Sequence, residues 1–89
     1  MYYVYIVLCA DDTLYTGITK ELNRRIEEHN TSDKGAKYTK ARRPVKLVYH
    51  DNHPDRSSAS KREYAIKKLS RQKKKLLINA FNPQVSAQS

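Results

Sequence analysis

The pattern of apolar and polar positions in the first part of the chain predicts a β-hairpin. Tyr2–Cys9 is almost continuously apolar or aromatic and rich in β-branched residues, which is typical of a buried strand. Residues 10–12 have the composition of a turn. Thr13–Ile18 is then expected to form a second strand that pairs with the first.

The next stretch predicts a helix. Leu22 and Ile26 are four positions apart and so share one helix face, which we expect to point toward the core. Thr19 is a candidate N-cap for a helix over about Lys20–Asn30. A polar stretch that contains glycine and proline, Thr31–Pro44, predicts a loop.

The second half of the chain predicts one strand and two helices. Val45–His50 is expected to be a short third strand that ends at Asp51–Pro54. Asp55 is the earliest N-cap candidate for a helix to about Leu69. Ser70 is expected to cap a last helix over Arg71–Ala80.

Together these elements predict an α+β fold, with a three-stranded, largely antiparallel sheet flanked by helices. Their order is β-β-α-β-α-α. The 89 residues suit one domain, which we place at residues 1–81, and residues 82–89 are expected to be a disordered C-terminal tail. A sheet of three strands needs helices packed on it to be stable alone.

The register of the hairpin is left open by the sequence. A three-residue loop would place Tyr5 opposite Gly17 and Val7 opposite Tyr15, so that the two tyrosines share one face. A two-residue loop would place these tyrosines on opposite faces, because a slip of one residue reverses the pattern.

Charge adds a prediction about partners. The formal net charge is +9, and fifteen of the eighteen lysines and arginines lie from Lys34 onward. This asymmetry predicts a surface that faces a polyanion, with nucleic acid first and an anionic membrane second. The simpler alternative is a solvated basic face. The single cysteine, Cys9, excludes an internal disulfide and predicts a cytoplasmic setting. No apolar run reaches the length of a membrane span, and of the two polyanions we expect nucleic acid and not a membrane to be the partner.

An ordered set of motifs, "YVYIVLCADDTLYTGI", "KELNRRIEEH" and "SKREYAIKKL", resembles the GIY-YIG nuclease family of small, stand-alone bacterial type. The first signature falls on residues 3–5 and the second on residues 15–17. Arg25 and His29 fall on the family's helix, and Glu63 falls where the family holds a metal-binding glutamate. The first signature departs from the pattern because Tyr3 replaces glycine.

The resemblance implies phosphodiester hydrolysis with one divalent metal, Mg²⁺ or Mn²⁺. It implies that Tyr5 and Tyr15 orient or deprotonate the attacking water, since a phenol can hydrogen-bond both water and phosphate. Arg25 would stabilise the charged phosphate. His29 would position the water or protonate the leaving oxygen, and Glu63 would bind the metal.

Each of these residues also has a purely structural interpretation. Tyr5 could simply pack over Gly17. Because Gly17 has no side chain, either the Tyr5 ring or a phosphate could approach its backbone closely. Arg25 could form a surface ion pair on its own helix. Glu63 could pair with Lys67 one turn later.

A basic segment with an interleaved tyrosine is a candidate nucleic-acid surface. Such a segment could follow a phosphate backbone and stack one base. The candidate nucleic-acid contacts are Gly17, Lys34, Lys37, Tyr38, Lys40, Arg42, Arg43 and Lys67. No base-reading motif is present, so binding is expected to follow phosphate contacts and nucleic-acid shape.

The sequence therefore predicts a metal-dependent endonuclease, structure-selective, that acts on DNA in preference to RNA, for example in repair or recombination. A protein partner could supply target specificity. One alternative is a catalytically weak or inactive nucleic-acid-binding module with the same fold. Another is a small basic protein that packs on a ribosome or on a larger protein.

Overall fold

The computed structural model of the protein describes residues 1–31 and 37–81. Lys34 and the expected tail at 82–89 lie outside the described residues. The secondary-structure elements, in chain order, are β1 (Tyr2–Leu8), β2 (Leu14–Thr19), α1 (Leu22–Thr31), α2 (Lys37–Lys40), β3 (Lys46–His53), α3 (Arg56–Lys67) and α4 (Arg71–Phe81).

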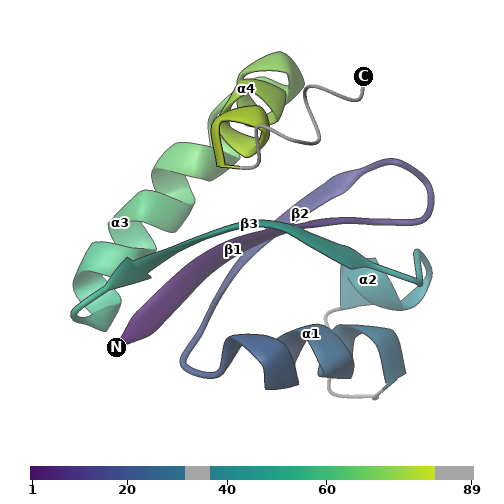
Figure 1. Ribbon diagram of the computed structural model, residues 1–89, viewed down its shortest axis with the longest axis horizontal. Helices are drawn as coiled ribbons and strands as arrows, with labels where there is room; N and C mark the ends of the chain where they lie inside the picture. The colour runs from purple at the N-terminus through teal and green to yellow at the C-terminus, as the bar shows by residue number, and fades with distance from the viewer. Residues whose placement is uncertain (32–36, 82–89) are drawn as a thin grey trace.

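One sheet organises these elements. Its strand order is β2-β1-β3, and β1 pairs antiparallel with both neighbours. Helices α1 and α2 lie on one side of the sheet, and α3 and α4 lie on the other (Figure 1). The predicted α+β fold is confirmed, with the nearly all-apolar first strand in the centre, where both of its faces are covered.

Alternation along β1 divides the core into two clusters. Val4 and Ile6 pack with Ala59 and Ile66 of α3, on the side of the long helices. Tyr5 and Val7 face the other side, where the partly buried residues include Leu22 and Ile26 of α1. The face of α1 that the sequence predicted to be apolar therefore covers the tyrosine side of the sheet.

The hairpin has the register of a three-residue loop. Tyr5 pairs with Gly17, and Val7 pairs with Tyr15. The amide of Cys9 donates to the carbonyl of Thr13 at 2.8 Å. Asp12 closes the loop with φ at 70°, a left-handed conformation that aspartate tolerates better than most residues. Tyr5 and Tyr15 consequently lie on the same face of the sheet.

The helix caps agree with the sequence in two of three cases. A carboxylate oxygen of Asp55 accepts from the amide of Ser58 at 2.8 Å, and the hydroxyl of Ser70 accepts from the amide of Lys73 at 3.2 Å. The prediction for Thr19 was wrong by two residues, because α1 begins at Leu22. The Thr19 hydroxyl instead accepts from the amide of Glu21 at 3.1 Å, in the bend before the helix.

Two further boundaries differ from the sequence prediction. The expected loop over 31–44 contains the one-turn helix α2, whose Thr39 is buried. The third strand does not break at Asp51, because β3 continues to His53 by pairing with the first residues of β1. Among the described residues, no helix combines the length and the apolar character needed to cross a membrane.

Candidate active site

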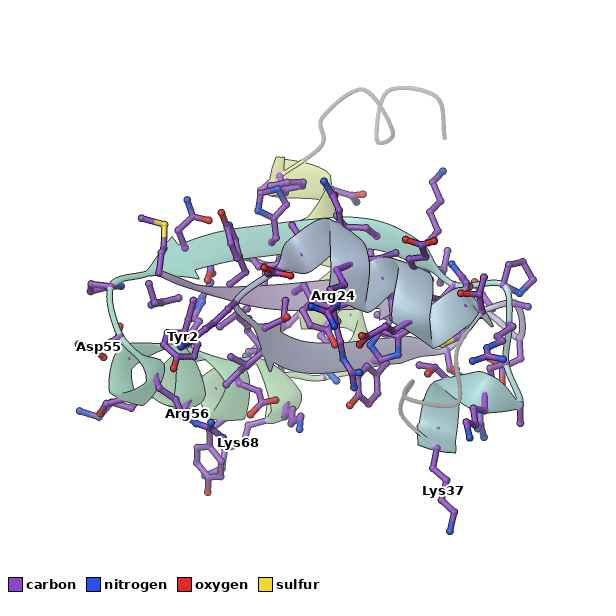
Figure 2. The ribbon with its side chains drawn as sticks, turned by 90° about the horizontal axis from the view of Figure 1, so that it is seen from below. Tyr2, Arg24, Lys37, Asp55, Arg56 and Lys68 are labelled. Carbon is purple, nitrogen blue, oxygen red and sulfur yellow. The ribbon has the colours of Figure 1, made fainter. Side chains whose placement is uncertain are left out.

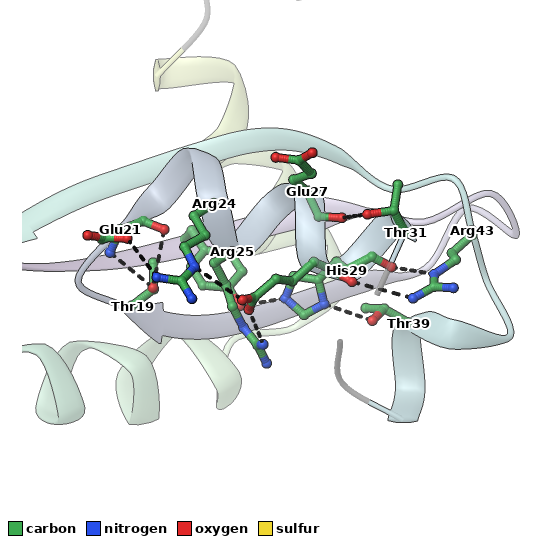
Figure 3. A network of polar contacts seen from close by, with 11 residues as sticks. Thr19, Glu21, Arg24, Arg25, Glu27, His29, Thr31, Thr39 and Arg43 are labelled. Carbon is green, nitrogen blue, oxygen red and sulfur yellow. Dashed lines mark hydrogen bonds and ion pairs between the residues drawn. The ribbon is translucent and has the colours of Figure 1, made fainter. Parts of the chain in front are cut away.

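The centre of the tyrosine face holds a buried chain of three polar side chains. The hydroxyl of Tyr5 lies 2.7 Å from Nε2 of His29, and Nδ1 of His29 lies 2.8 Å from the hydroxyl of Thr39. All three residues are almost completely buried. This chain therefore joins β1, α1 and α2 through one imidazole, whose two nitrogens are both engaged (Figure 3).

Gly17 allows the Tyr5 ring to lie directly on β2. A Cβ atom built at Gly17 would be 2.5 Å from the Tyr5 hydroxyl oxygen and 2.7 Å from Cζ. These separations are too short for any side chain, so glycine is required by the position of the ring. Of the two uses considered for Gly17, the structure shows the close approach of Tyr5.

Arg25 brings a permanent positive charge to the Tyr5 hydroxyl. Its Nη1 donates to Glu28 Oε1 at 3.0 Å, and it also hydrogen-bonds Tyr5. Burial alone would lower the pKa of Arg25, but its hydrogen bonds to Glu28 and Tyr5 outweigh this effect and raise the pKa. The Arg25 side chain is 26% exposed, so a bound anion could reach it.

The phenol of Tyr5 stays protonated at neutral pH. Burial is the largest influence and raises the pKa of Tyr5 to about 12. The hydrogen bond and positive charge of Arg25 act in the opposite direction, whereas the charges of Tyr15 and Glu63 raise the pKa further. Arg25 is thus the group that favours loss of the Tyr5 proton, and burial, the larger influence, opposes it.

His29 is neutral at the same pH. Burial lowers the pKa of its imidazole to about 4, and the positive charges of Arg25 and Arg43 lower it as well, against the opposing charge of Glu28. Since Arg25 can only donate, the Tyr5 oxygen accepts from it, and we assign the Tyr5 proton to the bond with Nε2. His29 therefore stands behind Tyr5 as a proton acceptor. Its complete burial separates it from a leaving oxygen in solvent, so direct protonation of that oxygen does not fit this packing.

Tyr15 is the more accessible of the two tyrosines. Its ring meets His29 edge-on, with 5.4 Å between centroids, and stacks on Tyr38 of α2 at 5.8 Å. Arg42 covers the Tyr38 ring at 4.0 Å, and Arg42 also forms an ion pair with Asp11 at 2.8 Å. Tyr38, which the sequence suggested might stack a nucleic-acid base, is therefore already engaged by two neighbours.

Glu63 is the residue that the sequence predicted to hold the metal, and in the structure it lies on α3 beside a lysine. Its partly buried side chain pairs with Lys67 at 3.4 Å, as the structural interpretation expected. After burial, its charge is among the influences that raise the pKa of Tyr5. The described residues contain no group of three histidine, cysteine or acidic side chains around a common point. A single carboxylate would suit Mg²⁺ or Mn²⁺, which commonly keep waters and take further oxygens from substrate phosphate.

The predicted nucleic-acid contacts separate into two groups. Lys37 and Lys40 are exposed on α2, and Figure 2 shows Lys37 extending away from the sheet. Arg43 instead points back at α1, where its Nε donates to the carbonyl of His29 at 2.5 Å and its Nη2 to that of Glu28 at 3.4 Å. Arg43 thus satisfies carbonyls at the end of a helix, a structural role that basic residues commonly take.

Sequence reasoning missed Thr39. Thr39 lies in a polar segment without periodicity, and its contact with His29 depends on how α2 packs. Glu28 was, with Glu21, one of the two ion-pair partners that the sequence offered for Arg25, and the structure shows the pair with Glu28. Tyr3, the departure from the first signature, turns toward β3, where its ring meets His50 edge-on at 6.1 Å.

Comparison with known families agrees with this arrangement. The family model described as the GIY-YIG catalytic domain matches residues 1–76. The chain belongs to the GIY-YIG catalytic domain family. Membership implies a metal-dependent endonuclease whose substrate is nucleic acid.

Close relatives define a smaller group within this family. The UPF0213 protein of Desulfotalea psychrophila is 60% identical over 86 residues, which are 97% of this chain and 78% of that protein. A UPF0213 protein of Staphylococcus aureus is 56% identical over 77 residues, 86% of this chain and 93% of the relative. The solution NMR structure of the UPF0213 protein of Bacillus halodurans matches with a TM-score of 0.61 and 44% identity, and covers 94% of this chain and 90% of its own.

Proposed function

We propose that this protein is a metal-dependent endonuclease that hydrolyses phosphodiester bonds, in DNA more readily than in RNA, at a site formed by Tyr5, Tyr15, Arg25, His29 and Glu63. The observation that carries the proposal is the buried bond between Tyr5 and His29, with Arg25 on the same hydroxyl. Packing of the core alone does not require that a histidine and an arginine both hydrogen-bond the hydroxyl oxygen of one tyrosine. Burial of these polar side chains costs free energy. A site that transfers protons would explain why the fold retains them.

Arg25 is the group that binds the reacting phosphate. Its guanidinium has a fixed, planar set of donors, and its bonds to Glu28 and Tyr5 hold it at the edge of the buried chain. Part of the group remains open to an anion. Charge that develops on the phosphate oxygens would be stabilised there without rearrangement of the protein.

The tyrosines and His29 handle the proton of the attacking water. Tyr15, the accessible phenol, orients the water. A proton lost from that water passes to the oxygen of Tyr5, while Tyr5 gives its own proton to Nε2 of neutral His29, 2.7 Å away. Burial and the charges of Arg25 and Arg43 oppose the positive charge that His29 then carries, and the nearby Glu28 favours it. This relay avoids a free phenolate, which the raised pKa of Tyr5 would make rare.

Glu63 would hold the divalent metal together with phosphate oxygens. A metal at this position supplies positive charge to the phosphate. Lys67, now paired with Glu63, would be released to contact a phosphate. Lys37 and Lys40 of α2 extend the phosphate contacts on the side of Tyr15.

The substrate is expected to be selected by its structure. Arginine and lysine contacts to phosphate carry no base information, and these groups dominate the candidate surface. A flap, branch or single-stranded segment would meet the site more easily than a uniform duplex, and a protein partner would add target specificity.

Cleavage of labelled single-stranded, duplex, flap and branched DNA, with matched RNA versions, tests the proposal. The panel is incubated with Mg²⁺, Mn²⁺ or EDTA, beside Glu63→Gln and Arg25→Ala. We expect metal-dependent cutting by the wild-type protein and its loss in both variants. Glu27→Gln is the matched control for Glu63, because it neutralises an exposed carboxylate on α1.

Two results would contradict the proposal. Cutting that persists unchanged in Glu63→Gln, with the same metal titration, would return Glu63 to its ion pair with Lys67. Salt-sensitive binding with no cutting under either metal would favour a nucleic-acid-binding module. Tyr3 in place of the signature glycine is the feature that favours that second function.

A further inference from the structure

Two hollows on the surface share lining residues at the end of β2. The first has a volume of about 320 Å³ and is lined by Thr19, Lys20, Glu21, Arg24, Arg25 and Glu28. The second has a volume of about 350 Å³ and is lined by Tyr2, Ile18, Thr19, Lys20 and Arg56. They share Thr19 and Lys20 at the end of β2, so Lys20 borders both hollows and Arg56 lines the second.

Lys20 and Arg56 are the cations of this surface that the proposed chemistry does not use. Arg24 and Arg25 are engaged by carboxylates of α1. Within residues 1–31 and 37–81, Lys20 and Arg56 form no ion pair, and Lys20 Nζ lies 5.2 Å above the Tyr2 ring. Two cations beside a hollow, without a carboxylate partner in the described chain, leave their charge available to an external anion.

The placement suits a nucleic-acid strand that passes through the site. Thr19 follows Gly17 by two residues on β2, about 7 Å at the usual rise, and points to the same face. Figure 2 shows Arg56 and Tyr2 at one end of the molecule and Lys37 at the other, so basic groups lie on both sides of the reacting centre.

We propose that Lys20 and Arg56, which line one hollow at the end of β2, form a phosphate-binding subsite for the substrate strand. The inference rests on the proposed nuclease function and extends it to a surface at the end of β2, away from the basic segment of α2. The subsite binds backbone phosphates of single-stranded or duplex nucleic acid and has no base preference. It would hold the strand in line with Arg25.

The first test measures binding alone. The affinity of fluorescent single-stranded and duplex DNA is determined by anisotropy in EDTA across a range of salt concentrations. Lys20→Ala with Arg56→Ala should reduce the salt slope by about 1.4 for single strands and about 1.8 for duplex, because two phosphate contacts are lost. Lys46→Ala with Lys73→Ala is the matched control, since both side chains are exposed on elements that do not line the hollows.

The second test locates the subsite. Substrates are shortened one nucleotide at a time on each side of the cut, and cleavage by the double variant is compared with wild type. The deficit of the variant should disappear once the strand on one side of the cut is too short to reach Lys20 and Arg56.

An unchanged salt slope, or an equal fall in the Lys46 and Lys73 control, would overturn the subsite. A deficit that does not depend on substrate length would also overturn it. Absence of cleavage with any metal would refute the nuclease proposal alone, because the salt slope in EDTA is measured without cutting.

Discussion

The hydroxyl of Tyr5 lies 2.7 Å from Nε2 of His29, and both residues are buried where β1 passes beneath α1. At neutral pH the phenol holds its proton and the imidazole is uncharged, since burial raises the pKa of Tyr5 to about 12 and lowers the pKa of His29 to about 4. The pair thus keeps one protonation state over a wide pH range, with His29 as the unprotonated member.

His29 should make the protein sensitive to mild acid. An unfolded histidine has a pKa near 6.5. Because the folded pKa is lower, the unfolded state binds more protons between pH 6.5 and pH 4, and stability is lost as the pH falls through that window. From pH 7 to pH 5 the free energy of unfolding should fall by about 2 kcal/mol.

Urea unfolding at both pH values measures this effect. His29→Gln, which cannot titrate, should be less stable at pH 7 but should lose much less stability between pH 7 and pH 5. Equal pH dependence in wild type and His29→Gln would show that His29 is not held neutral by the fold.

Gly17→Ala should disturb the Tyr5 ring. The new Cβ would lie 2.5 Å from the hydroxyl oxygen, and the ring has little room to move because His29 and Arg25 are bonded to it. We expect a loss of about 1–3 kcal/mol of stability, as for other overpacked cores, and loss of cleavage.

A double-mutant cycle identifies the cause. Gly17→Ala is compared in the wild-type background and in Tyr5→Leu, and the unfolding free energies are measured in urea. If the clash is with Tyr5, the substitution should cost much less in the Tyr5→Leu background. An equal cost in both backgrounds would point to the backbone of β2.

The sequence could predict the elements that depend on local pattern. Apolar runs and caps at Asp55 and Ser70 defined two strands and both long helices, because these signals are local. To predict that Tyr5 and Tyr15 lie on the same face of the sheet, the register of the hairpin had to be known. That register depends on the left-handed conformation of Asp12, which the residue types allow but do not require.

The rest of the site depends on contacts between distant segments. Arg42 and Arg43 are neighbours of the same type, yet one covers the Tyr38 ring and the other satisfies carbonyls of α1. Residues Asp51–His53 have the composition of a turn, but pairing with β1 extends them as strand. In both cases the tertiary partner decides, and nothing in the local sequence identifies that partner.

Asp51 should anchor α3, the helix that carries Glu63. Its carboxylate accepts from the hydroxyl of Tyr49, from Arg62 Nε at 3.1 Å and from His53 Nε2 at 2.6 Å. Burial alone would raise the pKa of Asp51, but these hydrogen bonds outweigh it and lower the pKa. Asp51→Ala should therefore cost roughly 2 kcal/mol, since several donors lose a charged acceptor.

Thermal or urea unfolding of Asp51→Ala, Arg62→Ala and the double variant measures this anchor. The double variant should cost less than the sum of the single ones, because it leaves no unpaired arginine. Strict additivity would show that Asp51 and Arg62 act independently.

Tyr38 should position Tyr15 rather than bind a base. Its ring stacks on Tyr15 with 5.8 Å between centroids and is covered by Arg42, so a base could stack there only by replacing one of them. An aromatic pair contributes about 0.5–1.5 kcal/mol beyond burial. Tyr38→Ala should thus lower kcat by about 2- to 10-fold with little change in KM. Tyr38→Phe keeps the ring and should behave as wild type. A raised KM with unchanged kcat would instead assign Tyr38 to base stacking, as the sequence suggested, and would show that Tyr15 is held in place without it.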